Sequence, residues 1–205
     1  MSVSSSSDLT AYPRPSVAVD AAVLTVPPDG PLSVVLIEDA SGRRLPGTFV
    51  HERERLDDAV RRGLAAKTGI EGVELQQLHV FDAPQRDDRG WVLSVAYLAV
   101  APWAAISSRA LVVPVAERGT LAFDHDEIVE RALSTIRNNY RTRPDPYRLI
   151  AEPFTIRQLH DLHEHVAGEA LMRDSFRRAM APFLSETGEL ATGTVGKPAR
   201  SYTHR

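Results

Sequence analysis

The stretch at residues 45–70 constrains this sequence most, because a loop containing proline and glycine leads there into an amphipathic helix. Positions spaced i, i+3, i+4, i+7, i+8 and i+11 share one face of a helix. In this chain they are Leu56, Ala59, Val60, Gly63, Leu64 and Lys67. Most of these residues are apolar, so the pattern predicts a helix that packs one face against a core.

The same stretch resembles the Nudix box, which runs Gly, five residues, Glu, seven residues, Arg-Glu-aliphatic, any, Glu-Glu, any, Gly-aliphatic. The matching residues are Leu45, Pro46, Gly47, Phe49, Val50, Glu54, Arg62, Leu64, Gly69 and Ile70. Thr48 stands where the box has its Gly. Gly63, Ala66 and Lys67 stand where the box has three carboxylates.

Those three positions share one helix face, where three Glu would form an oxygen-rich site for Mg²⁺ on a diphosphate. Here the face carries no carboxylate, and Lys67 adds a positive charge. An ion pair accounts for Glu54 and Arg62. We therefore expect a Nudix fold with no catalytic residues, no metal and no cofactor.

The alternative is a hydrolase of nucleoside diphosphate derivatives that recruits its metal ligands from elsewhere. Residual acid–base chemistry by His51, Glu52 and Arg53 is the least favoured possibility, because no metal ligands accompany these residues.

Composition limits the class of protein. The chain has 205 residues and no cysteine, which excludes disulfides and thiolate metal sites. Hydrophobic residues make up 43% of it, which is enough for a packed core. No apolar run reaches the ~20 residues that span a bilayer, and no signal peptide is evident. We expect a cytoplasmic protein without a membrane partner.

The charge is unevenly distributed along the chain. Residues 1–140 carry a net charge of −5 and residues 141–205 carry a net charge of +2. This difference is weak evidence for a polyanionic partner at the C-terminal end.

The order of predicted elements is that of an α/β/α sandwich with a mixed sheet. Residues 1–14 contain a serine run and one proline and are expected to be a disordered tail. Residues 39–44 are expected to form a turn. Strands are expected at residues 16–26, 33–38, 73–81, 91–100 and 110–115, and a closing helix at residues 126–140. We assign residues 15–142 to this Nudix-like effector and dimerisation domain.

The remaining residues, 143–205, are expected to form a second domain after a proline-rich boundary at 141–146. A short helix is expected at 147–151. Thr155 and Gln158 have capping-box spacing and open a helix that Gly168 can end. Asp174 is a candidate N-cap for a helix at 175–181. Strands are expected at 183–186 and 199–203, joined by a glycine-rich segment at 187–198 that carries Lys197.

Two helices, a short turn, a basic helix and a glycine-rich hairpin resemble a winged helix-turn-helix. In such units the recognition helix enters the major groove, where Arg pairs with guanine or phosphate. The candidate DNA-binding residues are Thr155, Arg157, Arg173, Ser175, Arg177, Arg178, Lys197 and Arg200. The alternative is a C-terminal helical hairpin with solvated arginines.

Taken as a whole, the chain resembles the NrtR family of Nudix-related transcriptional regulators. Three features carry the resemblance: the Nudix box without its carboxylates, the stretch FTIRQLHDLHEHVAGEALMRDSFRRAM and the segment GKPARSY. The resemblance implies a homodimer that binds a palindromic operator in double-stranded DNA and represses genes for NAD synthesis or salvage. It also implies control by ADP-ribose or a related nucleotide in the former catalytic pocket.

Arg43, Arg44, Arg86 and Arg89 are the candidate effector-binding residues. Thr48 and Trp91 depart from what such a pocket would be expected to carry. A solvated hairpin loop is the equally favoured interpretation of residues 86–90. A nucleotide-sensing module that acts through protein contacts is a third functional hypothesis.

His160, His163 and His165 lie close enough in sequence to suggest a metal site. His160 and His163 share a helix face, but His165 points away from it, and no carboxylate is expected to complete the site. A hydrogen-bonded structural set is favoured over a metal site.

Overall fold

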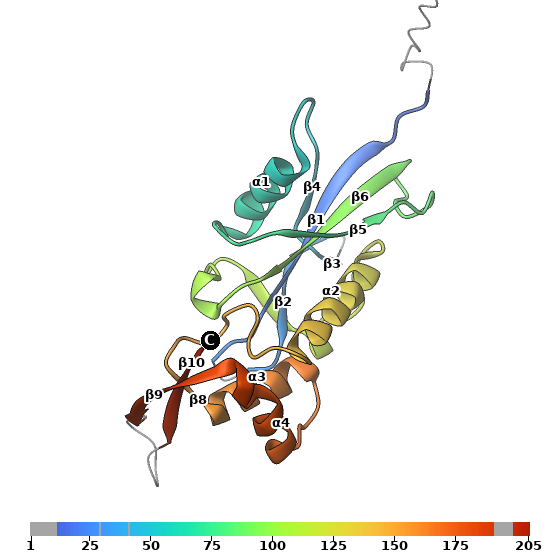
Figure 1. Ribbon diagram of the computed structural model, residues 1–205. Coiled ribbons are helices and arrows are strands. Elements are labelled where there is room, and N and C mark those ends of the chain that lie inside the picture. The colour runs from blue at the N-terminus through green and yellow to red at the C-terminus, as the bar shows by residue number, and fades with distance from the viewer. Residues whose placement is uncertain (1–11, 29, 41, 191–198) are drawn as a thin grey trace, which may run out of the picture.

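The computed structural model describes residues 12–190 and 199–205 except residues 29 and 41 (Figure 1). Most of the expected N-terminal tail therefore lies outside the described residues. No helix within the described ranges is both long and apolar enough to cross a membrane.

The first part of the chain forms a mixed seven-stranded sheet. Its strands are β1 (Ser16–Thr25), β2 (Ser33–Asp39), β3 (Gly42–Arg44), β4 (Gly47–Phe49), β5 (Gln76–Phe81), β6 (Val92–Val100) and β7 (Leu111–Pro114). The main order is β3-β2-β1-β6-β5, with β4 beside β1 and β7 beside β2. β1 and β6 run parallel from the Ser16–Val92 pair to the Leu24–Val100 pair, and the other pairs are antiparallel. This arrangement confirms the expected mixed α/β sheet.

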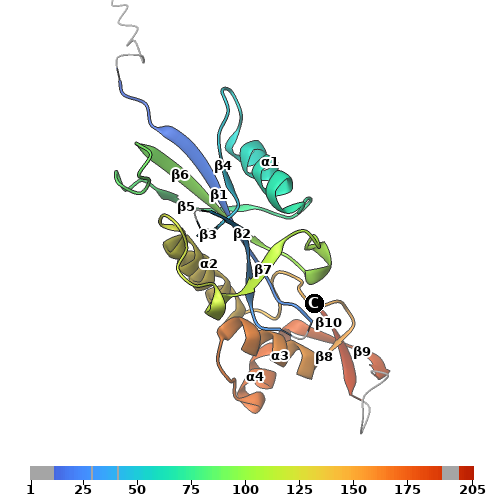
Figure 2. The same ribbon diagram turned by 180° about the vertical axis from the view of Figure 1, so that it is seen from behind.

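Two helices cover opposite faces of the sheet (Figures 1 and 2). α1 (Leu56–Thr68) ends at Gly69, whose φ of 72° is the left-handed conformation expected of a helix-ending glycine. Val19, Ala21 and Val23 of β1 face α1. The alternate residues Ala22 and Leu24 face α2 (His125–Tyr140). β1 is therefore buried on both faces, as expected for a central strand.

The second part of the chain is a smaller unit. It contains β8 (Phe154–Thr155), α3 (Ile156–Ala167), α4 (Arg173–Met180), β9 (Leu184–Leu190) and β10 (Arg200–His204). The three strands pair in the order β8-β10-β9. Phe154, Leu159, Phe176, Met180 and Leu184 form its core. A three-residue 3₁₀ turn at Ala181–Phe183 joins α4 to β9 in this unit. Two similar turns, at Trp103–Ala105 and Val115–Glu117, lie in the first part of the chain. Two helices followed by a hairpin confirm the expected winged helix.

α3 begins with the predicted capping box. The Thr155 hydroxyl accepts a hydrogen bond from the Gln158 backbone N–H at 3.2 Å, and the Gln158 side chain accepts one from the Thr155 N–H at 2.8 Å. The helix ends at Gly168, whose φ is 76°. Leu162 and Val166 of α3 join the core beneath α2, so the two parts of the chain pack directly against each other.

The predicted helix at residues 147–151 is wrong, because a buried carboxylate holds that segment as a turn. Asp145 is fully buried and accepts hydrogen bonds from the Tyr140 hydroxyl at 2.7 Å and from the Leu149 and Ile150 N–H groups at 2.9 Å each. These bonds draw the loop around one side chain and compete with helical pairing.

Three further expectations were wrong in detail. α4 begins at Arg173 after Met172, and Asp174 lies in the first turn, where its charge favours the helix N-terminus without capping it. Residues 39–44 are not only a turn, because β3 pairs back onto the end of β2. β4 was not predicted; it pairs with residues 18–20 of β1.

Candidate functional site

The end of the box helix α1 carries positive charge where a Nudix hydrolase carries carboxylates. The Lys67 ammonium donates to the Gly47 carbonyl oxygen. Burial, and secondarily the charge of Arg44, lower the pKa of Lys67 below its usual value. Gly63 and Ala66 offer no ligand atoms at all. The three box positions therefore do not fit Mg²⁺, which requires oxygen ligands.

Glu54 and Arg62 keep a structural role. The Arg62 Nε and Nη2 atoms donate to the two Glu54 carboxylate oxygens at 2.7 and 2.8 Å. Arg62 also donates to the Phe49 carbonyl oxygen at 3.0 Å. This pairing lowers the pKa of Glu54 to about 2. The ion pair that the sequence suggested is confirmed, and it ties the loop after β4 to α1.

Thr48 and Gly63 are fitted to each other. A Cβ added to Gly63 would lie 2.8 Å from the Thr48 Cγ2, closer than real Cβ contacts. The Thr48 side chain thus occupies space that a longer residue at position 63 would need. Gly47 is equally constrained, since a Cβ there would lie 1.8 Å from the Asp20 Oδ1. Thr48 in the loop and Gly63 in the helix therefore restrict each other's size, and both differ from the Nudix box.

A pocket of about 270 Å³ opens beside these residues. Its lining residues are Ala18, Asp20, Arg44, Leu45, Gly47, Thr48, Phe49, Lys67, Arg86, Asp87, Arg89, Phe123 and His125. We call it the effector-domain pocket. Four cationic residues line it against two acidic ones, so the pocket favours an anionic ligand.

Asp20 lies on the floor of the effector-domain pocket in a buried network. The Ser94 hydroxyl donates to the Asp20 Oδ2 at 2.5 Å, and the His125 Nε2 lies 3.5 Å from the Oδ1. Burial opposes ionisation of Asp20, but bonding to His125 and Ser94 and the charge of Arg86 together lower its pKa. The His125 Nδ1 accepts from the Leu45 N–H at 2.9 Å, so the neutral ring carries its proton on Nε2, facing Asp20.

Arg86 is buried, with a side chain only 3% exposed. Its Nε and Nη2 atoms donate to the Asp124 carboxylate at 2.8 and 2.6 Å. Asp87 is also buried. The interpretation of residues 86–90 as a solvated hairpin loop is therefore wrong for this part of it. Arg86 supplies positive charge to the pocket while anchored to Asp124, 38 residues away.

Arg89 is the accessible cation of the loop. Its guanidinium carbon lies 5.4 Å from the Phe49 ring centroid and 5.1 Å from that of Phe123, and both rings are partly exposed. Asp87 holds Arg89 through hydrogen bonds of 2.8 and 2.7 Å. The phenylalanines were missed in the sequence because only the folded chain brings Phe123 beside Phe49. A cation between aromatic rings suits a ligand with both phosphate and a flat ring.

Arg43 and Arg44 differ in position. Arg44 lines the effector-domain pocket and pairs with Asp39 at 2.5 Å. Arg43 lies 3.5 Å from Glu38 and donates to the Glu117 carbonyl oxygen at the same distance, and it does not line the pocket.

The candidate recognition helix α4 presents a basic surface. Arg173, Arg177 and Arg178 are exposed, whereas Phe176 and Met180 are buried in the core of the small unit. Within the described residues, none of the three arginines makes a hydrogen bond or ion pair. Their charges are therefore free to meet a polyanion.

The other candidate DNA-binding residues fall into different settings. The Thr155 side chain is buried in the capping box, and Arg157 is exposed 3.7 Å from Asp161. Arg200 is exposed and pairs with Glu186 at 2.9 Å. Ser175 is exposed but lines a second cavity between α2 and α4. Lys197 lies outside the described residues.

The histidines on α3 have structural partners. His160 and His163 are buried, and the His160 Nε2 lies 3.0 Å from the Leu171 carbonyl oxygen. Contrary to expectation, Asp161 and Glu164 place carboxylate oxygens within 4.8 Å of the His160 ring nitrogens and of each other. Glu164 accepts from the Leu171 N–H at 2.8 Å, however, so this group holds the turn before α4.

Comparison with known proteins identifies relatives along most of the chain. Residues 146–203 match the family model described as the NrtR DNA-binding winged helix domain. The "ADPR responsive transcriptional repressor NtrR" of Acinetobacter baylyi is 30% identical over 184 residues, which cover 82% of this chain and 73% of that protein.

Two solved structures are also similar. The crystal structure of Shewanella oneidensis NrtR complexed with a 27mer DNA has 31% identity and a TM-score of 0.74, covering 92% of this chain and 93% of that one. The cocrystal structure of the NUDIX domain of the same protein with ADP ribose has 30% identity and a TM-score of 0.54, covering 62% and 92%.

Proposed function

This chain belongs to the NrtR family, and from that premise we propose that it is a DNA-binding transcriptional repressor of genes for NAD synthesis or salvage. The observation that carries the proposal is the free basic surface of α4 on a winged helix. Three exposed arginines without a described partner suit the phosphates and base edges of a major groove. Thr155, Arg157, Ser175, Lys197 and Arg200 remain proposed supporting contacts.

We also propose that the chain acts as a homodimer on a palindromic operator. Winged-helix dimers place two recognition helices in successive turns of the major groove, which matches a two-fold DNA site. The proposed division is residues 15–142 for effector binding and dimerisation and residues 143–205 for DNA binding.

The proposed effector is ADP-ribose or a related nucleotide bound in the effector-domain pocket. Arg44, Arg86 and Arg89 provide positive charge toward a diphosphate, and Phe49 and Phe123 offer faces for a ring. The relative crystallised with ADP ribose supports the choice of ligand. Arg43 does not line the pocket and is a less direct candidate.

We propose that the effector domain binds this nucleotide without hydrolysing it. Gly63, Ala66 and Lys67 offer no metal ligand, and both acids of the pocket are already engaged, Asp20 by Ser94, His125 and Arg86 and Asp87 by Arg89. The alternative of a hydrolase predicts release of AMP from ADP-ribose with Mg²⁺ or Mn²⁺. AMP release at high protein concentration, abolished by removing the metal, would contradict the proposal.

DNA binding is tested by fluorescence anisotropy with a duplex from upstream of NAD-synthesis genes. Arg177→Ala or Arg178→Ala is expected to cost about 1–3 kcal/mol if the residue reads a base, and wild-type affinity is expected to fall steeply with salt. Arg131→Ala is the matched control, because Arg131 is an α2 surface residue near Glu127. The proposal fails if neither α4 substitution weakens DNA binding and if salt does not change the affinity of the wild type. In that case α4 does not read DNA.

A further inference from the structure

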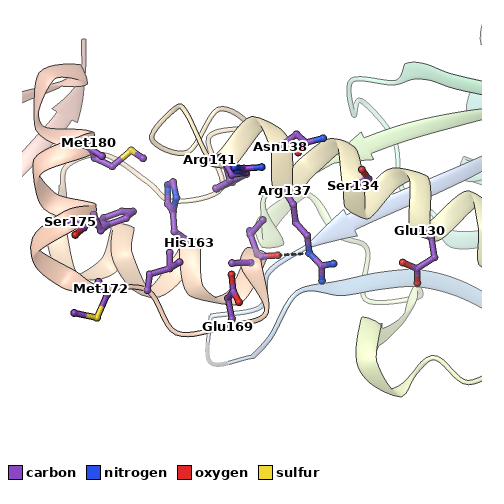
Figure 3. Close-up of a pocket in the computed structure, with 16 residues that line it drawn as sticks. Glu130, Ser134, Arg137, Asn138, Arg141, His163, Glu169, Met172, Ser175 and Met180 are labelled. Atoms are coloured by element: carbon purple, nitrogen blue, oxygen red, sulfur yellow. Dashed lines mark hydrogen bonds between the residues drawn. The ribbon is translucent and has the colours of Figure 1, made fainter.

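The second cavity lies where the two parts of the chain meet. It measures about 770 Å³ and runs between α2 and the α3–α4 pair (Figure 3). We call it the interdomain cleft. Its volume falls within the range of about 300–1,000 Å³ found for small-molecule sites. It lies apart from the effector-domain pocket, and no residue lines both.

The two walls of the interdomain cleft differ in chemistry. α2 contributes polar side chains, including Ser134, Arg137 and Asn138, whereas α3, α4 and the turn between them contribute Val166, Leu171, Phe176 and Met180. Met172, at the start of α4, is 78% exposed. A cavity with one polar and one apolar wall fits an amphipathic ligand.

The charge on the polar wall is mainly positive. Arg137 lies in the last turn of α2, and Arg141 follows as the residue that caps the helix C-terminus. The Arg137 Nε donates to the Val166 carbonyl oxygen at 3.2 Å (Figure 3). The Arg141 guanidinium has no ion pair within the described part of the chain. Glu130, at the far end of the cleft, is neutralised by Arg118 at 2.6 Å. Glu169 is the remaining acidic residue in the lining.

His163 adds a buried donor to the lining. It is only 3% exposed, and its Nε2 accepts from the Asp145 N–H at 3.4 Å. Burial, and secondarily the charge of His160, lower the pKa of His163 to about 4, so the ring is neutral at neutral pH. Because Nε2 acts as the acceptor, the proton of the neutral ring sits on Nδ1, which is then the donor atom of the ring.

We propose that the interdomain cleft is a second ligand site, which takes a small aromatic carboxylate. Arg141 supplies the charge that pairs with the carboxylate, and the His163 Nδ1–H supplies a donor for a ligand oxygen. Phe176, Leu171 and Met180 provide the apolar surface for the ring.

A ligand in the interdomain cleft would contact the recognition helix directly. Ser175 and Ala179, one turn apart on α4, line the cleft. Arg173 and Arg177, also one turn apart, lie on the other side of the buried Phe176 and Met180. The ligand would therefore join α2 to α4 and leave the arginines exposed. Any effect of this ligand on the affinity for DNA rests on the proposed function, whereas binding of the ligand in the interdomain cleft does not.

Isothermal titration calorimetry with 1-naphthoate tests the site, with 1-naphthamide as the uncharged analogue. Wild-type protein saturated with ADP-ribose should bind 1-naphthoate saturably, about tenfold or more tightly than 1-naphthamide. Arg141→Gln should remove that preference. Arg131→Gln, at an arginine of α2 that does not line the cleft, should keep that preference. Ala179→Trp and Ser134→Trp fill the cleft from opposite walls, and whichever variant folds should abolish binding.

No saturable binding of 1-naphthoate would overturn the proposal, as would binding that survives in a folded variant with a filled cleft. Binding that ADP-ribose abolishes would place the ligand in the effector-domain pocket and overturn it too. If 1-naphthoate binds as expected but no operator is bound, the proposed function fails and the site stands. If the operator is bound and 1-naphthoate is not, the site fails alone.

Discussion

Thr48 and Gly63 show how two single residues limit each other where the loop before α1 packs against the helix. The methyl carbon of Thr48 lies only 2.8 Å from the place that a Cβ at position 63 would occupy. The size of the side chain that fits at either position therefore depends on the size of the residue at the other. The sequence revealed that both positions depart from the Nudix box, but not that the two departures compensate for each other, because that needs the loop folded onto α1.

Replacing Gly63 with Ala is predicted to destabilise the protein by about 1–3 kcal/mol through overpacking against Thr48. Thr48→Gly is predicted to relieve most of this cost. The four proteins of this double-mutant cycle can be compared by urea denaturation, with an expected coupling of about 1 kcal/mol or more. Additive effects would show that the two side chains do not share this space.

The buried His163 ring predicts a specific pH dependence of stability. Its folded-state pKa of about 4 lies below the value of about 6.5 for an unfolded histidine. The folded state thus holds fewer protons, so the stability that His163 contributes is complete above pH 6.5 and is lost as the pH falls toward 4, by about 3 kcal/mol at most.

Urea denaturation of wild type and His163→Gln at pH 7 and pH 4.5 measures this contribution. The wild type is predicted to lose more stability than the variant over that interval. Equal losses in the two proteins would mean that His163 titrates normally in the folded state.

At the scale of elements, hydrophobic periodicity predicted the strongest features. The strands β1, β2 and β6, the helix α2 and the capping box of α3 lie within a few residues of their expected positions. β4 was missed because a three-residue strand is defined by its pairing with β1 rather than by its own pattern. The turn at residues 145–150 was missed because it depends on one buried side chain, Asp145.

The candidate sites were predictable only in part for the same reason. The basic residues of α4 could be named from the sequence, but the burial of Arg86 depends on Asp124, which is distant in the chain. Likewise, helical spacing alone could not place Ser175 against α2.

Asp145→Ala is predicted to destabilise the protein by about 3–5 kcal/mol. The substitution leaves the Tyr140 hydroxyl and the Leu149 and Ile150 N–H groups without their acceptor in a buried loop. Asp161→Ala, at a carboxylate that is 48% exposed on α3, should cost about 0.5 kcal/mol or less. Thermal or urea unfolding measures both. A loss at Asp145 no larger than that at Asp161 would contradict the central role of the buried carboxylate.

At the scale of the whole molecule, α2 connects the two functional regions. Its first residue, His125, lies in the effector-domain pocket, bonded to Leu45 and facing Asp20. Its last residue, Tyr140, packs edge-on against His163, and His163 packs against Phe176 of α4. A 16-residue helix spans about 24 Å, so one rigid element joins the pocket to the recognition helix. Occupancy of the pocket and DNA binding should therefore be coupled.

The most direct test of the account is the affinity of the full-length protein for its operator, measured by fluorescence anisotropy with and without ADP-ribose in the presence of Mg²⁺. We predict that ADP-ribose changes operator affinity by about 5-fold or more, that Arg89→Ala weakens this response, and that the nucleotide is recovered intact. Equal operator affinity with and without saturating ADP-ribose, or conversion of the nucleotide to AMP during the measurement, would contradict the account.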